Sequence, residues 1–189
     1  MLVIRLFWKL FLTFFGWNTS VQFPHKVKKC IIIVAPHTSW RDFVIGVAYR
    51  SVLQLKHARF LGKKELFDGP FGFLFRWLGG VPVDRFSKQN MVDQVVDLFN
   101  MHEALKIAIA PEGTRKKVNR LKTGFYHIAK KADIPIVMVG LDFSKKEILI
   151  AEPFNTGNDE AKDFEYIISF FAPVQGKHPE LGLGHLKVK

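Results

Sequence analysis

The chain of 189 residues has the size of one domain, and its content of 48% hydrophobic and 24% charged residues excludes a disordered protein. Its single cysteine, Cys30, excludes an internal disulfide, and its seven histidines have no zinc-binding spacing, so we expect no metal site. The formal net charge of +11 indicates an acidic partner, and both an anionic membrane surface and nucleic acid qualify.

Residues 1–17 are almost entirely apolar and predict an amphipathic helix. Arg5, Lys9 and Thr13 recur every four positions and line one narrow stripe, while the other face carries leucine, phenylalanine and tryptophan, including Trp17. Such a helix is about 25 Å long, shorter than the roughly 30 Å hydrocarbon core of a bilayer. We therefore expect it to lie in the membrane interface. The alternatives are a core helix and a signal peptide, although no small-residue cleavage site follows.

A short strand and a helix flank the most informative polar loop of the chain. Residues 30–35 are β-branched and uncharged, which predicts a buried strand, and residues 41–55 have a nearly helical apolar period. On a regular helix, the separation of His37 and Asp42 would point their side chains about 140° apart, so their pairing needs the non-helical loop that Pro36 begins. Paired in this way, the histidine can act as a general base whose tautomer the carboxylate fixes. The alternative is an ordinary loop histidine and an aspartate that favours the helix dipole.

The middle of the chain continues the alternation of strands and helices. We expect short strands at 59–62 and within 79–85, a helix over 87–105 and a strand at 107–110. The segment 69–78 is rich in phenylalanine and tryptophan, and for it we favour packing in the core over a short helix at the membrane surface.

The strand at 107–110 runs into a polar loop, which is where α/β proteins place their sites. Within this loop, Gly113 lets the backbone approach a ligand closely, and Arg115 offers a planar fork suited to phosphate. In the C-terminal third we expect further elements at 124–131 (helix), 134–141 and 147–151 (strands, with 141–143 as hairpin partner) and 159–171 (helix), then a loose tail over 173–189.

These elements predict a single α/β domain with a mixed central sheet flanked by helices. Residues 26–189 would form this domain, preceded by a membrane-anchoring segment at residues 1–25. The loops 36–42, 85–88 and 111–123 are expected to converge at one end of the sheet.

Four motifs in this order resemble the glycerolipid acyltransferases typified by lysophosphatidic acid acyltransferase. His37 and Asp42 match the His-x4-Asp block of that family, and Gly79–Arg85 matches its Gly-x-hydrophobic-x-hydrophobic-x-Arg block. Glu112–Arg115 is the Glu-Gly-Thr-Arg block, and Ile134–Val139 is the proline-containing apolar strand, here without the second proline that the family usually has.

The resemblance implies transfer of a fatty acyl chain from acyl-CoA or acyl-carrier protein to a lyso-phospholipid hydroxyl, with 1-acylglycerol-3-phosphate as the favoured acceptor, in phospholipid biosynthesis. No cofactor is implied beyond the thioester co-substrate. His37 would remove the hydroxyl proton and Asp42 would orient it. Arg85 and Arg115, together with Lys64, would bind an acceptor phosphate.

The remaining residues of the third block are also assigned to substrate binding. For Glu112 the resemblance implies acceptor binding, and the alternative is a structural partner for Arg85 or Arg115. Thr114 is included as a substrate-binding residue, and backbone amides near Gly113 are candidate oxyanion donors. No serine or cysteine stands at a nucleophile elbow, so direct transfer is favoured over an acyl-enzyme.

Other readings remain open at this point. The acceptor could be a phosphate-free hydroxylated lipid such as a lyso-aminolipid, and a hydrolase would use a similar base on water. A non-catalytic membrane-binding protein leaves His37 and Asp42 unused. We expect no nucleic-acid partner, because the aromatic residues cluster with aliphatic ones and no known motif is present. The expected location is a membrane, at its cytoplasmic face.

Overall fold

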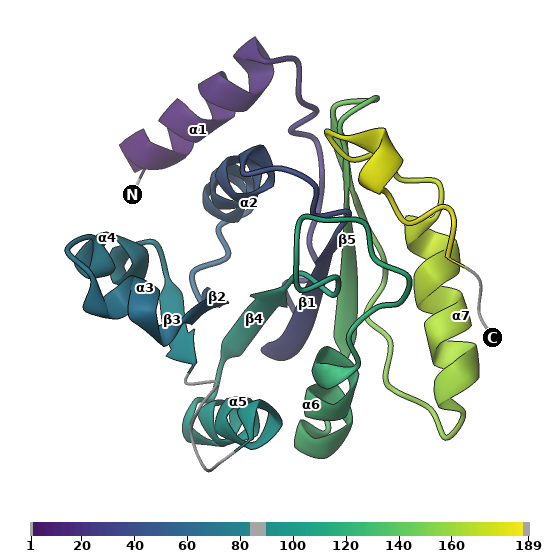
Figure 1. Ribbon diagram of the computed structural model, residues 1–189. Helices are drawn as coiled ribbons and strands as arrows, with labels where there is room; N and C mark the ends of the chain where they lie inside the picture. Colours follow the sequence, from purple (N-terminus) through teal and green to yellow (C-terminus); the bar gives the residue numbers. More distant parts are fainter. Residues whose placement is uncertain (1, 84–89, 187–189) are drawn as a thin grey trace.

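The computed structural model describes residues 2–83 and 90–186 and confirms an α/β domain with a mixed sheet (Figure 1). Its elements are α1 (Leu2–Phe14), β1 (Lys29–Ala35), α2 (Arg41–Val52), β2 (Ala58–Lys63), α3 (Lys64–Asp68), α4 (Gly72–Trp77), β3 (Gly80–Val83), α5 (Met91–Met101), β4 (Leu105–Ile109), α6 (Gly124–Ala132), β5 (Ile136–Asp142), β6 (Glu147–Ile150), α7 (Glu160–Phe171) and a 3-10 turn (Pro179–Leu181). The strand order is β3-β2-β4-β1-β5-β6, in which only β6 at the edge is antiparallel to its neighbour.

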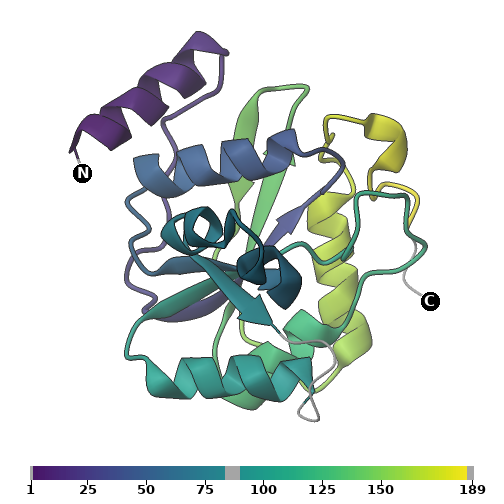
Figure 2. The ribbon, with the colours of Figure 1, turned by 60° about the vertical axis from the view of Figure 1, so that its left-hand side comes forward.

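Strand β1 lies in the middle of the sheet and is buried on both faces, as its run of apolar residues predicts. Alternate residues point to opposite faces, so Ile31 and Ile33 pack with α5, α6 and α7, whereas Cys30 and Ile32 pack with α2. Figure 2 shows α2 on one face of the sheet, with α5, α6 and α7 on the other. Burial of each isoleucine contributes about 1.5–3 kcal/mol.

Helix α1 packs on α2 and also presents an apolar face to the outside. Leu12 is fully buried, and the Nε of Arg5 donates to the carbonyl of Val52 at 3.2 Å. Trp17 was expected on the exposed face but is buried, because its ring meets Tyr49 edge-on. The exposed apolar residues are Leu2, Val3, Ile4, Leu6, Phe7, Leu10, Phe14 and Phe15. Among the described residues, no helix has both the length and the apolar character that crossing a bilayer needs.

The prediction that the aromatic segment 69–78 lies in the core is wrong. Phe71, Phe73 and Trp77 are 65%, 72% and 68% exposed. A helix as short as α4 buries only one side, and here Gly72 occupies that side, where a Cβ would lie 2.0 Å from the carbonyl oxygen of Phe67. The aromatic rings consequently point away from the domain.

Residues 173–186 of the C-terminal tail pack on the domain, contrary to the expectation of a loose segment. Val174, Leu183 and Leu186 are buried, and the amide of Phe143 donates to the carbonyl of Gln175 at 2.8 Å. These apolar residues are spaced too irregularly to indicate a helix or strand, so their burial depends on packing against the rest of the domain.

The parallel strands β1 and β4 are neighbours, so the loops that follow them leave the same edge of the sheet. This confirms the predicted convergence of loops 36–42 and 111–123. The predicted third loop, 85–88, falls outside the described residues.

Candidate active site

The structure brings the side chains of His37 and Asp42 together. After β1 ends at Ala35, the chain leaves the sheet in a short non-helical loop, and Asp42 lies in the first turn of α2. The Nδ1 of His37 lies 3.1 Å from the Oδ2 of Asp42. The imidazole is 30% exposed while the carboxylate is buried, so the other ring nitrogen of His37 remains accessible to a substrate.

Three hydrogen bonds converge on one oxygen of Asp42. Besides the imidazole, the backbone amides of Thr38 and Ser39 each donate to Oδ2 at 2.8 Å. These hydrogen bonds tie the loop to the first turn of α2 and thereby fix the position of His37. Oδ1 is buried and has no hydrogen-bond partner within residues 2–83 and 90–186, so all of its support comes through Oδ2.

Glu112 supports the same loop from the turn that follows β4. Its Oε1 accepts a 2.7 Å hydrogen bond from the backbone amide of His37. The side chain is only 2% exposed, and burial raises the pKa of its carboxyl group, which the hydrogen bond from His37 partly offsets. In the described part of the chain it forms no ion pair with Arg115, the structural partner suggested by the sequence. Its place behind His37 indicates a positioning residue.

The other residues of the third block line the cavity in front of His37. Gly113, with a φ of +67°, Thr114 and Arg115 all contribute to its wall. The amide of Gly113 donates to the carbonyl of Ala110 at 3.1 Å, so this amide is not free to act as an oxyanion donor. Arg115 is exposed and forms no ion pair with any other described residue, which leaves its guanidinium available to a ligand.

The two remaining predicted phosphate ligands are not at this wall. Lys64 begins α3 and does not line the cavity. Arg85 lies outside the described residues. In the described ranges, no three histidine, cysteine or acidic side chains are grouped as a metal site would require.

A cavity of about 940 Å³ extends from His37 along α2. Its walls are mainly apolar side chains of α2 and of the strands beneath it, a composition that suits a hydrocarbon chain. The apolar lining includes Phe23, Ile32, Val34, Phe43, Val47, Leu53, Leu55, Phe60, Leu61, Leu78, Ile109, Val139, Leu141, Ile148 and Ile150.

Comparison with known proteins decides the family. The model of the acyltransferase family matches residues 18–142, which is well over half of the chain. The chain belongs to the acyltransferase family. This confirms the resemblance found in the sequence at the level of the family. No curated protein sequence matches the chain significantly.

A solved structure supports the same fold for this acyltransferase. The chain is similar to the crystal structure of the 1-acyl-sn-glycerophosphate (LPA) acyltransferase PlsC from Thermotoga maritima, with a TM-score of 0.61 and 21% sequence identity. The similarity covers 88% of this chain and 74% of that chain.

Two arginines of the acyltransferase cavity were missed in the sequence. Arg50 and Arg59 both line it, although neither belongs to a family motif. The sequence did contain a signal for Arg50. This residue lies on the same stripe of α2 as Phe43 and Val47, where the helical period predicts an apolar residue and a charged one stands out.

The C-terminal tail reaches the loop that carries His37. The hydroxyl of Thr38 accepts a hydrogen bond from the amide of His178 at 3.2 Å. Gly176 lies against the same side chain, and a Cβ at this position would be 2.7 Å from Oγ1 of Thr38. Since the amide of Thr38 also donates to Asp42, a single residue, Thr38, connects the tail to the His37–Asp42 pair.

We expect Gly176→Ala to lower kcat about tenfold with little change in KM, because it displaces Thr38 without reaching the cavity. Gly157→Ala is the matched control, since its Cβ would meet Asp163 at an ordinary 3.4 Å. Steady-state kinetics and thermal unfolding of both variants provide the measurement. Equal kinetics for the two alanine variants would contradict a positioning role for the tail.

Proposed function

We propose that this acyltransferase transfers a fatty acyl chain from an acyl thioester to the hydroxyl of a lyso-phospholipid, with 1-acylglycerol-3-phosphate as the favoured acceptor. The observation that carries the proposal is the His37–Asp42 pair at one end of a mainly apolar cavity of about 940 Å³. The cavity offers a mainly apolar space for an acyl thioester next to a base that can activate a hydroxyl.

In the proposed reaction, the free Nε2 of His37 takes the proton of the acceptor hydroxyl as its oxygen attacks the thioester carbonyl carbon. Asp42 accepts from Nδ1 and steadies the imidazolium that forms. A new C–O bond forms and the C–S bond breaks. The imidazolium then returns its proton to the departing thiolate, so the enzyme ends in its starting state.

The proposal is tested by incubating the purified protein with radiolabelled palmitoyl-CoA and a panel of lyso-lipids that includes lysophosphatidic acid and a phosphate-free lyso-aminolipid. We expect labelled diacyl product from lysophosphatidic acid. A preference for the phosphate-free lipid would show that the proposed acceptor is wrong. Release of free fatty acid alone would show that the protein hydrolyses the thioester and does not transfer the acyl chain.

Arg115 is proposed to bind the acceptor phosphate, because its exposed guanidinium lines the cavity beside the His37 loop. Arg115→Lys keeps the charge but loses the planar fork, so KM for lysophosphatidic acid should rise about tenfold. Arg120→Lys makes the same exchange in the same loop outside the cavity and should leave KM unchanged. Equal losses with a phosphate-free acceptor would show that Arg115 serves another purpose.

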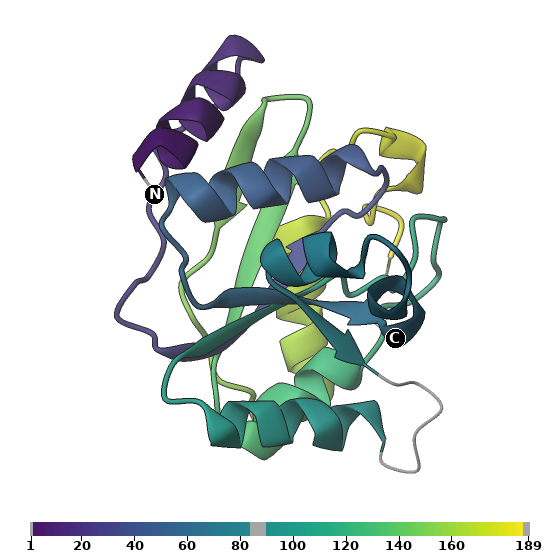
Figure 3. The same cartoon turned by 90° about the vertical axis from the view of Figure 1, so that its left-hand side faces the viewer.

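We further propose that the protein binds anionic membranes through the exposed faces of α1 and α4. In Figures 1 and 3, α2 lies between these two helices, so their apolar side chains flank the helix that covers the cavity. The net charge of +11 favours an anionic surface.

Replacing Leu6, Phe7 and Leu10 together by serine should abolish most binding to phosphatidylglycerol vesicles, because it removes exposed apolar surface and leaves the buried Leu12 in place. Vesicle co-sedimentation measures the effect. Tyr166→Ser, an exposed position on α7, is the control. Unchanged binding of the triple variant would rule out α1 as the principal anchor.

A further inference from the structure

Two arginines lie at the end of the cavity that is remote from His37. Arg50 is in the last turn of α2 and follows Asp42 by eight residues, which is about 12 Å along a helix. Arg59 is near the start of β2, whose other end points toward the edge of the sheet that carries the His37 loop. Both side chains line the cavity.

One wall of the cavity connects the two ends. Phe43, Val47 and Arg50 follow one another along the same stripe of α2, at spacings of four and three residues. The ring of Phe43 meets that of Phe60 on β2 edge-on, with centroids 5.1 Å apart. An apolar groove between α2 and β2 thus runs from His37 to the two arginines.

The guanidinium of Arg50 is only partly satisfied by the protein. Its Nη1 donates to the carbonyl of Leu78 at 2.9 Å, whereas its Nε is buried without a partner among the described residues. Gly79, with a φ of +89°, leaves room for this group, since a Cβ there would lie 3.0 Å from Nη2 of Arg50.

No acidic side chain among the described residues forms an ion pair with either arginine. Burial lowers the pKa of Arg50, and the positive charge of Arg59 lowers it further. Two like charges at the wall of a cavity repel each other unless an anion lies between them.

We propose that Arg50 and Arg59 form a phosphate-binding site of the acyltransferase, at the end of the cavity opposite His37. The proposal rests on the proposed function, in which a thioester donor and a lyso-phospholipid both carry phosphate. Guanidinium groups bind phosphate through paired, charge-assisted hydrogen bonds. The separation from His37 favours the donor, because a pantetheine arm places its phosphate far from the thioester, while an acceptor phosphate lies close to the reacting hydroxyl.

Kinetics with matched substrates tests the site and identifies the phosphate. In Arg59→Gln and Arg50→Lys, KM for palmitoyl-CoA should rise about tenfold or more, while KM for palmitoyl-pantetheine, which lacks phosphate, should not change. If the site takes the acceptor instead, the rise should occur with lysophosphatidic acid and not with monoacylglycerol. Unchanged KM values, or equal changes with the phosphate-free substrates, would overturn the proposal. Lys56→Gln removes one exposed charge from the same loop region without touching the cavity and serves as the control.

Binding to protein that lacks the catalytic base separates this proposal from the proposed function. Titration of CoA and of short-chain lysophosphatidic acid into His37→Ala, with and without Arg59→Gln, requires no turnover. We expect Arg59→Gln to weaken one of the two ligands about tenfold and to leave the ligand-free melting temperature unchanged or higher, since it removes a repulsion. Weaker binding after Arg59→Gln, together with a wild-type protein that shows no acyl transfer, would keep the site and reject the function. Affinities for both ligands that Arg59→Gln leaves unchanged would reject the site.

Discussion

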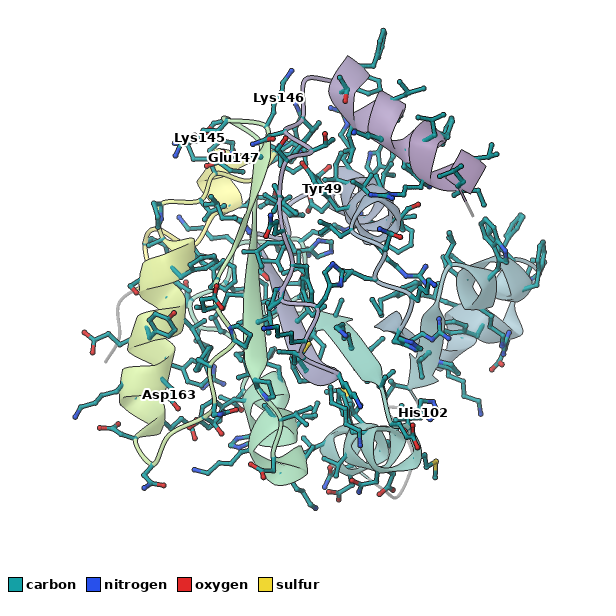
Figure 4. All side chains as sticks on the ribbon, turned by 180° about the vertical axis from the view of Figure 1, so that it is seen from behind. Tyr49, His102, Lys145, Lys146, Glu147 and Asp163 are labelled. Atoms are coloured by element: carbon teal, nitrogen blue, oxygen red, sulfur yellow. The ribbon has the colours of Figure 1, made fainter. Side chains whose placement is uncertain are left out.

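Replacing His37 by alanine should lower kcat for acyl transfer by about a thousandfold or more, because it removes the base that deprotonates the acceptor hydroxyl in the proposed mechanism. The loop should persist, since the amides of Thr38 and Ser39 still donate to Asp42. Single-turnover assays with labelled palmitoyl-CoA measure the loss. His102→Ala is the matched control, because His102 lies beside α5, away from Tyr49 and α2 (Figure 4).

Asp42→Asn tests the second member of the pair. An asparagine oxygen can still accept from the two loop amides, but it cannot stabilise an imidazolium, so kcat should fall by about a hundredfold or more with an unchanged melting temperature. Normal turnover of a folded His37→Ala protein would end the proposed mechanism. A large loss of stability in Asp42→Asn would make the carboxylate a structural group.

Glu112→Ala should lower both stability and turnover. It leaves the amide of His37 without its acceptor and opens a cavity behind the loop, so we expect a loss of about 2–3 kcal/mol of stability and at least a tenfold fall in kcat. Glu112→Gln keeps an acceptor for this amide and should therefore retain most of the stability and most of the kcat of the wild type. Denaturant unfolding and kinetics measure the two effects. Failure of glutamine to restore activity would assign the carboxylate a direct role in the reaction.

The buried carboxyl of Glu112 also predicts the sign of a pH effect. Burial raises its pKa in the folded protein above the value of about 4.3 in the unfolded chain. The folded state therefore holds this proton more tightly, and the wild type loses stability as the pH rises from about 4 through the folded pKa. The melting temperature of Glu112→Gln relative to the wild type should rise between pH 4 and pH 7. A difference that does not vary with pH would show that burial of this carboxyl costs no stability.

Local sequence patterns determined most of the fold. The β-branched run of residues 30–35 indicated a buried strand, and the structure places β1 at Lys29–Ala35 in the middle of the sheet. Periodic apolar residues indicated α2, α5 and α7, although the predicted ends extended several residues too far in α2 and α5. Such signals survive in the fold because an element with one apolar stripe has one favourable way to be buried.

The candidate site was only partly visible in the sequence. His37, Asp42 and Arg115 were singled out because polar residues after buried strands gather at one edge of a parallel sheet. The sequence did not show that Glu112 binds the backbone amide of His37, because a hydrogen bond to a backbone amide does not depend on the side chain at that position.

Only the tertiary structure decided which apolar residues are covered. Trp17 and Phe73 are equally hydrophobic in the sequence, yet the first is buried by Tyr49 and the second is 72% exposed on α4. The ordering of the tail on Thr38 and the meeting of Arg50 and Arg59 in one cavity likewise join segments that are remote or irregular in the sequence. Composition and periodicity describe one element at a time, whereas burial and charge pairing depend on which other element lies against it.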